Sequence, residues 1–325
     1  MPPAEENVPG LAGARASTPG SNVGDRAYGA ALHLMGGAVL LVAGVIVLEM
    51  AGVARPAAAL GLGAYLTGTD WDPVTGAFGA LPFVYGTLVT SAVAIALALP
   101  VSVGLALFLS EMGPRRLRLP VAFAIEILAA IPSVIYGLWG LFVLVPVLRD
   151  PIEPALGKVL GFLPLFQGPP IGLGFLAAGV ILAVMILPTI ASVAIQVLRT
   201  VPQSLKEAAL ALGATRWETI RMAVLPYSRA GIAGAALLGL GRALGETMAV
   251  TMVIGNSPEI RASLFAPGYS LPAVIANEFA EATSDLHVAA LAGLGLVLFG
   301  LTVVLNALAR LLIQAMARGL RGVAA

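Results

Sequence analysis

The 325-residue chain contains no cysteine, two histidines and few charges. Without cysteine it can form no disulfide, thiolate nucleophile or cysteine-ligated metal site. His33 and His287 are far apart in the sequence, which leaves little material for a metal site or a membrane-embedded hydrolase. A net charge of +1 does not provide the concentrated basic face that nucleic acid requires. We therefore expect neither an enzyme nor a nucleic-acid-binding protein.

Hydrophobic residues make up 59% of the chain, and the mean hydropathy is +0.96. Polar surface is too scarce to cover a soluble fold of this size. Crossing a bilayer takes about 20 helical residues, and continuous apolar runs without alternation favour helices over a barrel. The sequence thus predicts an all-α integral membrane protein with six transmembrane helices, at residues 30–53, 87–109, 121–148, 171–197, 231–255 and 288–313.

The basic residues predict how these helices are oriented. With both termini cytoplasmic, thirteen of the 18 basic residues lie in inner segments and four, Arg55, Arg149, Lys158 and Arg261, in outer ones. This distribution follows the positive-inside rule. Residues 1–26, which are rich in Pro, Gly, Ala and Ser, are predicted to form a disordered cytoplasmic tail before a transmembrane domain at 27–325. The first apolar run begins too late for a cleaved signal peptide.

The longest inner loop, residues 199–230, has the pattern of two short helices. Ser204 and Glu207 have the spacing of a capping box, which predicts a helix start there. Gly213 is expected to end that helix, a second one opens at 214–218, and Leu225-Pro226 is expected to close the unit. An interfacial pair of amphipathic helices is the alternative interpretation. Since no GxxxxGK[ST] phosphate loop occurs, any ATP is expected on another chain.

The fifth predicted helix contains two charges, Arg242 and Glu246. Inserting either charged side chain at mid-bilayer costs a free energy of about 2.5–3.5 kcal/mol. Their i,i+4 spacing predicts that both lie on one face of the helix. The pair is either a salt bridge that fastens the helix to its neighbours, or an oxyanion site in which Glu246 balances an empty Arg242. Glu126, in the third predicted helix, could line the pore or pair with Arg242, but we expect a protonated glutamate hydrogen-bonded within the bundle. An ion-driven carrier also contains such charges, but it leaves the 199–230 loop unexplained.

The 199–230 loop resembles the EAA loop of ABC importer permeases. The matching positions are Glu207, Ala208, Ala209, Gly213, Leu225 and Pro226, whereas Ala223 stands where the family usually has isoleucine. The resemblance implies a type I ABC importer permease fold and a loop that docks onto a separate ATPase.

The segments 78–87, 131–142 and 239–250, the last reading GLGRALGETMAV, resemble the PstC permeases of phosphate-specific ABC importers. The resemblance extends from about residue 71 to 312. It implies phosphate passage by Arg242 and Glu246 in the cytoplasmic membrane. It also implies a complex with a homologous permease PstA, two copies of the ATPase PstB and the binding protein PstS. ATP and Mg are expected on PstB, with no cofactor on this chain. A molybdate or sulfate permease is the alternative, against which the 239–250 segment argues.

Overall fold

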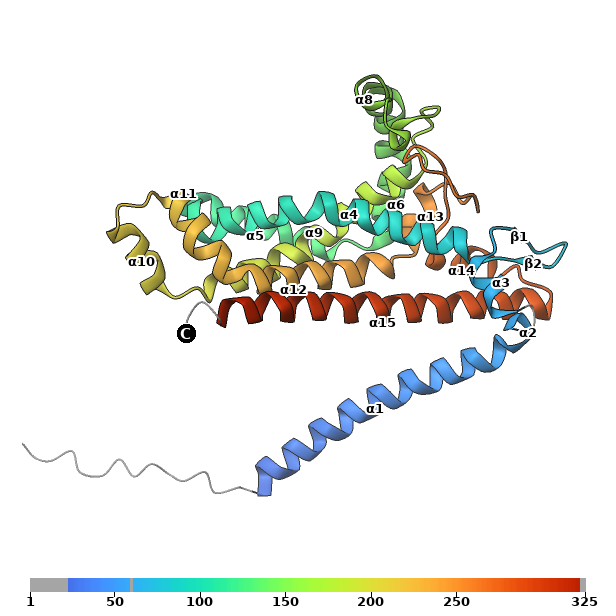
Figure 1. The fold of residues 1–325 in the computed structure, drawn as a ribbon, viewed down its shortest axis with the longest axis horizontal. Coiled ribbons are helices and arrows are strands. Elements are labelled where there is room, and N and C mark those ends of the chain that lie inside the picture. The colour runs from blue at the N-terminus through green and yellow to red at the C-terminus, as the bar shows by residue number, and fades with distance from the viewer. Residues whose placement is uncertain (1–22, 59–60, 322–325) are drawn as a thin grey trace, which may run out of the picture. The chain divides into compact units, whose positions relative to one another are not determined.

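A computed structural model describes residues 23–58 and 61–321, which are mostly helical (Figure 1). The described residues contain six helical segments long and apolar enough to cross a membrane, which confirms the predicted number. They are Arg26–Val53, Leu81–Met112, Ser133–Leu160, Phe175–Arg199, Arg216–Leu244 and Asp285–Gln314. The chain divides after Glu49 into two compact units.

The first membrane-spanning segment belongs to helix α1 (Val23–Val53), most of which lies in the first unit. The helix begins at Val23, three residues before the expected end of the N-terminal tail at residue 26. The rest of that tail, residues 1–22, lies outside the described residues.

The core of the second unit is built by α4 (Leu81–Leu107) and α9 (Phe175–Arg199), which pack along each other. Glycines allow this approach: a Cβ on Gly179 would come within 2.4 Å of Val93. Helix α12 (Leu225–Leu244) packs against α9 in the same way, since a Cβ on Gly239 would lie 2.6 Å from Ile190. Helix α15 (Asp285–Arg321) in turn packs against α12.

The third predicted span, 121–148, is wrong. Helix α5 (Arg115–Ala130) ends before an extended Ile131-Pro132 pair, with ψ angles of 128° and 143°. Proline disfavours a helical conformation at the residue before it, so the chain breaks there. The spanning segment starts at Ser133 and continues through shorter pieces: α6 (Ser133–Trp139), η2 (Gly140–Leu144), α7 (Val145–Val147), η3 (Leu148–Ile152) and α8 (Glu153–Leu160).

The connection to α9 contains the 3₁₀ turn η4 (Pro164–Phe166) and two glycines with positive φ, Gly168 at 118° and Gly172 at 79°. Glu153 secures this connection. Its side chain is almost completely buried, and its carboxylate accepts a hydrogen bond of 3.0 Å from the Gly172 amide.

At the end of the unit opposite the 199–230 loop, short elements pack around the start of α15 (Figure 1). Trp71 Nε1 donates a 2.8 Å hydrogen bond to Glu278, and His287 Nε2 lies 3.1 Å from the same oxygen. His287 therefore belongs to a structural network. The short elements are α2 (Arg55–Ala58), α3 (Leu62–Thr67), the unpredicted hairpin β1 (Trp71–Asp72) and β2 (Ala77–Phe78), and α14 (Leu271–Glu278). A further short helix, α13 (Met248–Val253), packs against α6 and α14.

Candidate functional site

The 199–230 loop begins with helix α10 (Gln203–Ala211), and the predicted capping box at its start is wrong. Pro202 is the N-cap, with an extended ψ of 133° and no side-chain capping bond. Because Pro202 already fixes this start, Ser204 lies inside the first turn instead of at the cap. Glu207 and Ala208 are exposed on the helix surface, and Ala209 is half-buried.

Gly213 ends α10 as predicted. Its φ is +87°, in the left-handed region that glycine adopts without steric cost. The Gly213 amide donates to Leu210 O at 3.0 Å, and the Ala214 amide donates to Ala209 O at 3.2 Å. These two bonds form a Schellman motif, which satisfies carbonyl groups at the end of the helix. The loop is thus an ordered turn.

A capping box does occur in this loop, at the second helix, α11 (Arg216–Thr219). Thr215 Oγ1 accepts from the Glu218 amide, and the Glu218 carboxylate accepts from the Thr215 amide at 2.7 Å. The helix continues through the π-helical stretch η5 (Ile220–Val224) into α12.

Leu225 and Pro226 therefore do not close the unit, as the sequence had predicted. Pro226 lacks an amide donor and would break a regular α-helix. Here it follows a wider π turn, in which the Leu225 amide bonds Ile220 O. A single helical segment consequently runs from Arg216 to Leu244.

An ion pair joins α10 to the end of the second membrane-spanning segment, and sequence reasoning missed it. Lys206 Nζ lies 2.6 Å from an oxygen of Glu111, in η1 (Phe108–Met112), and the two side chains are only 17% and 15% exposed. The partners are 95 residues apart, so no local pattern could pair them. A cavity of ≈ 160 Å³ lies beside the pair and is lined by residues of α10, α11 and η5.

Large apolar side chains are exposed on the surface of this helical pair. Leu210, Leu212 and Trp217 are 47%, 90% and 54% exposed. Tryptophan is among the residues that contribute most to the binding free energy of protein–protein interfaces. We call the segment from Gln203 to Thr219 the coupling unit.

Arg242 and Glu246 do not share a helical face, which corrects the prediction. Helix α12 ends at Leu244, Gly245 is its C-cap, and α13 begins at Met248. Arg242 is exposed in the last turn of α12, where a cation is favoured by the helix dipole. Glu246 lies in the break, and its carboxylate accepts from the Ala249 amide at 3.4 Å. The ion pairs found in the described part of the chain involve neither residue, so they give no support to a fastening salt bridge.

Two interrupted helices meet at this break. Helix α13 packs against α6, and a Cβ on Gly137 would lie 3.1 Å from the Ala249 Cα. Irregular backbone at membrane depth is tolerated where protein buries it or where it lines a polar cavity. The arrangement presents the planar guanidinium of Arg242, with five donors, at the surface of the chain.

Glu126 does not belong to this site. It is exposed on α5, and no hydrogen bond of its side chain is found among the described residues. The described residues therefore give no support to a glutamate hydrogen-bonded within the bundle or paired with Arg242.

Six spanning segments, a folded coupling unit and a charge at a broken helix define a class: transport permeases of the ABC importer type. The family described as the binding-protein-dependent transport system inner membrane component matches residues 98–321, and the chain belongs to it. It is a multi-pass membrane protein and a translocating subunit, and ATP hydrolysis occurs on a separate chain. The matched residues include the coupling unit and Arg242.

Similar proteins are found among curated sequences and solved structures. The chain is 49% identical over 280 residues to the phosphate transport system permease protein PstC of Mesorhizobium japonicum, which covers 85% of each chain. It is 52% identical over 254 residues to PstC of Xylella fastidiosa, covering 77% of this chain and 78% of that protein. A bacterial alginate ABC transporter has the same fold, with a TM-score of 0.57 at 16% identity, over 91% of this chain and 96% of that one.

Proposed function

We propose that the chain is the permease subunit through which an ATP-driven importer moves inorganic phosphate across the membrane. The observation that carries this proposal is the exposed Arg242 at the broken helix, for which no carboxylate partner is found within the described residues. A guanidinium presents planar, bidentate donors that match a phosphate oxyanion. Relatives about half identical over most of the chain are named phosphate permeases.

The proposal includes the partners of the complex. A second permease, PstA, would complete the pathway on the exposed side of Arg242. Two PstB subunits would bind ATP and Mg, and PstS would deliver phosphate. This chain itself would bind no cofactor, and both of its termini would be cytoplasmic. Membership of a binding-protein-dependent family supports an ATPase and a binding protein in general, while the names PstA, PstB and PstS follow from the resemblance of the sequence to PstC permeases.

Transport and ATP use would be linked by one helical segment. The coupling unit would dock onto PstB through its exposed face, and α11 continues through η5 into α12 up to Arg242. At 1.5 Å per residue, the 29 residues of this segment extend over about 43 Å. Movement of α11 by the ATPase would thus be carried along the helix to the Arg242 end. Glu246, in the break, would balance the arginine when no phosphate is present.

An alternative function is import of another oxyanion, sulfate or molybdate, which would use the same guanidinium chemistry. ATP-dependent uptake of labelled phosphate into vesicles that hold the whole complex tests both functions. We expect uptake that resists excess sulfate and molybdate and that is lost with Arg242→Gln, while Arg149→Gln, an exposed arginine paired with Asp150, is unaffected. Uptake blocked by either competitor would refute phosphate as the substrate, and unchanged uptake in Arg242→Gln would refute the site.

A further inference from the structure

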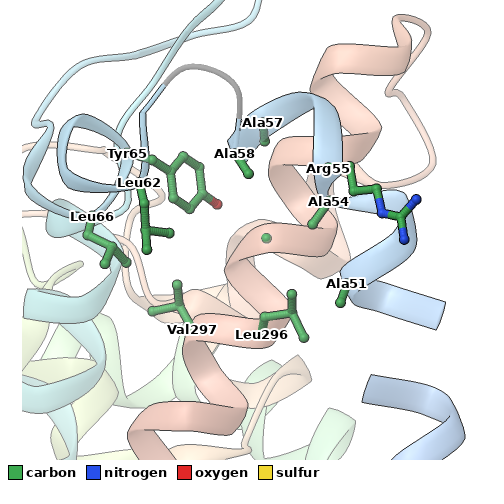
Figure 2. Close-up of a pocket in the computed structure, with 11 residues that line it drawn as sticks. Ala51, Ala54, Arg55, Ala57, Ala58, Leu62, Tyr65, Leu66, Leu296 and Val297 are labelled. Atoms are coloured by element: carbon green, nitrogen blue, oxygen red, sulfur yellow. The ribbon is translucent and has the colours of Figure 1, made fainter. Parts of the chain in front are cut away.

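An apolar cavity lies between the short helices α2 and α3 and the outer half of α15. Figure 2 shows the side chains of Leu62, Leu66 and Val297 around one open space, with Arg55 at its rim. Its volume is ≈ 350 Å³, which lies in the range of small-molecule sites, about 300–1,000 Å³. The phosphate pathway proposed above does not use this space.

The walls of this cavity are held in place by Tyr65. The tyrosine is buried, and its hydroxyl donates a 2.7 Å hydrogen bond to Ala290 O. A Cβ on Gly293 would lie only 2.8 Å from the Tyr65 hydroxyl oxygen, so glycine is what lets α3 approach α15. The Tyr65 hydroxyl thus already has a hydrogen-bond partner, and apart from Arg55 at the rim the other residues that line the cavity are apolar.

The cavity lies beside the membrane-spanning part of α15. Gly293 and Val297 come 8 and 12 residues after the start of α15 at Asp285, which places them about 12–18 Å along the helix. Leu62 and Leu66, on a helix of six residues that cannot span a bilayer, are 65% and 39% exposed. An apolar space open at this level meets hydrocarbon and is suited to an acyl chain.

Arg55 is the one charged residue among those that line the cavity. Two other arginines of the predicted outer segments are paired with neighbouring acids, Arg149 with Asp150 at 2.8 Å and Arg261 with Glu259 at 2.6 Å. For Arg55 no ion pair is found in the part of the chain that the structure describes, and the side chain is exposed. Figure 2 shows its guanidinium directed away from the apolar wall, where a headgroup would lie.

From this charge complementarity we propose that the cavity binds one anionic phospholipid. An acyl chain fills the space between α3 and α15, and the headgroup phosphate accepts hydrogen bonds from Arg55. Guanidinium recognises phosphate with bidentate geometry, and basic residues at the membrane surface attract anionic lipids.

Native mass spectrometry of the complex tests this, after equilibration with equal phosphatidylglycerol and phosphatidylcholine. Arg55→Gln removes the cation, and Ala58→Phe fills the cavity from an exposed position on α2. We expect each to weaken retention of one phosphatidylglycerol about tenfold. Arg261→Gln and Ala307→Phe, the latter exposed on α15 outside the cavity, are matched controls that keep the lipid. Arg55→Lys should retain more phosphatidylglycerol than Arg55→Gln because lysine keeps the positive charge.

Mapping provides a second measurement. A phosphatidylglycerol with a photoreactive acyl chain should label peptides that contain residues 51–66 and 289–301. Retention unchanged by both Arg55→Gln and Ala58→Phe would overturn the proposal. If the wild-type complex retained phosphatidylcholine as well as phosphatidylglycerol, headgroup selection would be refuted. It would also be refuted if Ala58→Phe lost both lipids while Arg55→Gln lost neither. Crosslinks between two copies of the chain at this surface would refute a lipid occupant.

Discussion

The ion pair between Glu111 and Lys206 is expected to hold α10 of the coupling unit against the second spanning segment. Lys206→Met keeps most of the side-chain volume but removes the charge, leaving the Glu111 carboxylate largely buried without its partner. Glu111→Gln tests the pair from the other side. Among the described residues, no other hydrogen bond joins α10 to η1, so we expect α10 to detach more often in both variants.

The magnitude follows from burial. Exposed ion pairs contribute about 0–1 kcal/mol, whereas removing one partner of a fully buried pair costs about 3–5 kcal/mol. With side chains 17% and 15% exposed, this pair lies between these limits, and we estimate about 2 kcal/mol. At 1.4 kcal/mol per factor of ten, the detached fraction of α10 should rise about 30-fold.

Two assays measure this change on the assembled complex. Hydrogen exchange of the α10 amides should accelerate, and solute transported per ATP hydrolysed should fall, while the amount of complex stays the same. The double variant Glu111→Lys with Lys206→Glu, which swaps the two charges, should restore much of the slow hydrogen exchange and of the transport per ATP. Arg149→Met, in a pair 52% and 62% exposed, is the matched control with little effect. Unchanged exchange and coupling in Lys206→Met would refute the reasoning.

Three further predictions concern other residues. Gly213→Ala should destabilise the folded loop by about 1–2 kcal/mol through its left-handed φ alone, since a Cβ would meet nothing within 4 Å, and should lower transport per ATP. Asparagine tolerates this φ better, so Gly213→Asn should lose less transport per ATP. Equal losses in the two variants would argue against backbone strain. Arg242→Gln should abolish uptake in a complex that still assembles, as pull-down of the subunits would check, whereas failed assembly would indicate a structural residue. Hydrogen bonds from the Thr75 hydroxyl and the Val74 amide lower the pKa of Asp72 below its usual value of 3.8. The ionised carboxylate therefore stabilises this turn at pH values above 3.8. The stabilisation is lost as the pH falls through the lowered pKa of the folded state. An NMR titration of the Asp72 carboxyl should give a midpoint below 3.8 that rises toward it in Thr75→Val; a wild-type midpoint at or above 3.8 would contradict this.

Features that depend on long apolar runs or on a residue with a special backbone conformation were predictable from the sequence. Six spanning segments follow from hydropathy, and the turn at Gly213 follows from glycine's access to positive φ. The third span was misplaced because the run from 121 to 148 is apolar on both sides of Pro132, and hydropathy does not register a backbone break. Proline before a helix was the available signal.

The candidate site was only partly predictable. The sequence identified Arg242 and Glu246 as unusual charges, but i,i+4 spacing describes a continuous helix, and α12 ends between them at Leu244. The coupling unit was found by its motif, whereas its tie to Glu111 depends on tertiary packing between residues 95 apart. Pro226 was interpreted as a terminator because π-helical turns leave no clear pattern in a sequence.

The unbroken helical segment from Arg216 to Leu244 has a thermodynamic consequence. If docking of the ATPase on the coupling unit changes the affinity of the Arg242 end for its solute, linkage requires the reverse effect by the same factor. A solute bound near Arg242 must then alter how tightly the coupling unit holds the ATPase. On the proposed function, the occupancy of the pathway would thereby be reported to the ATPase through this one helix, in addition to the work that the ATPase does on the pathway.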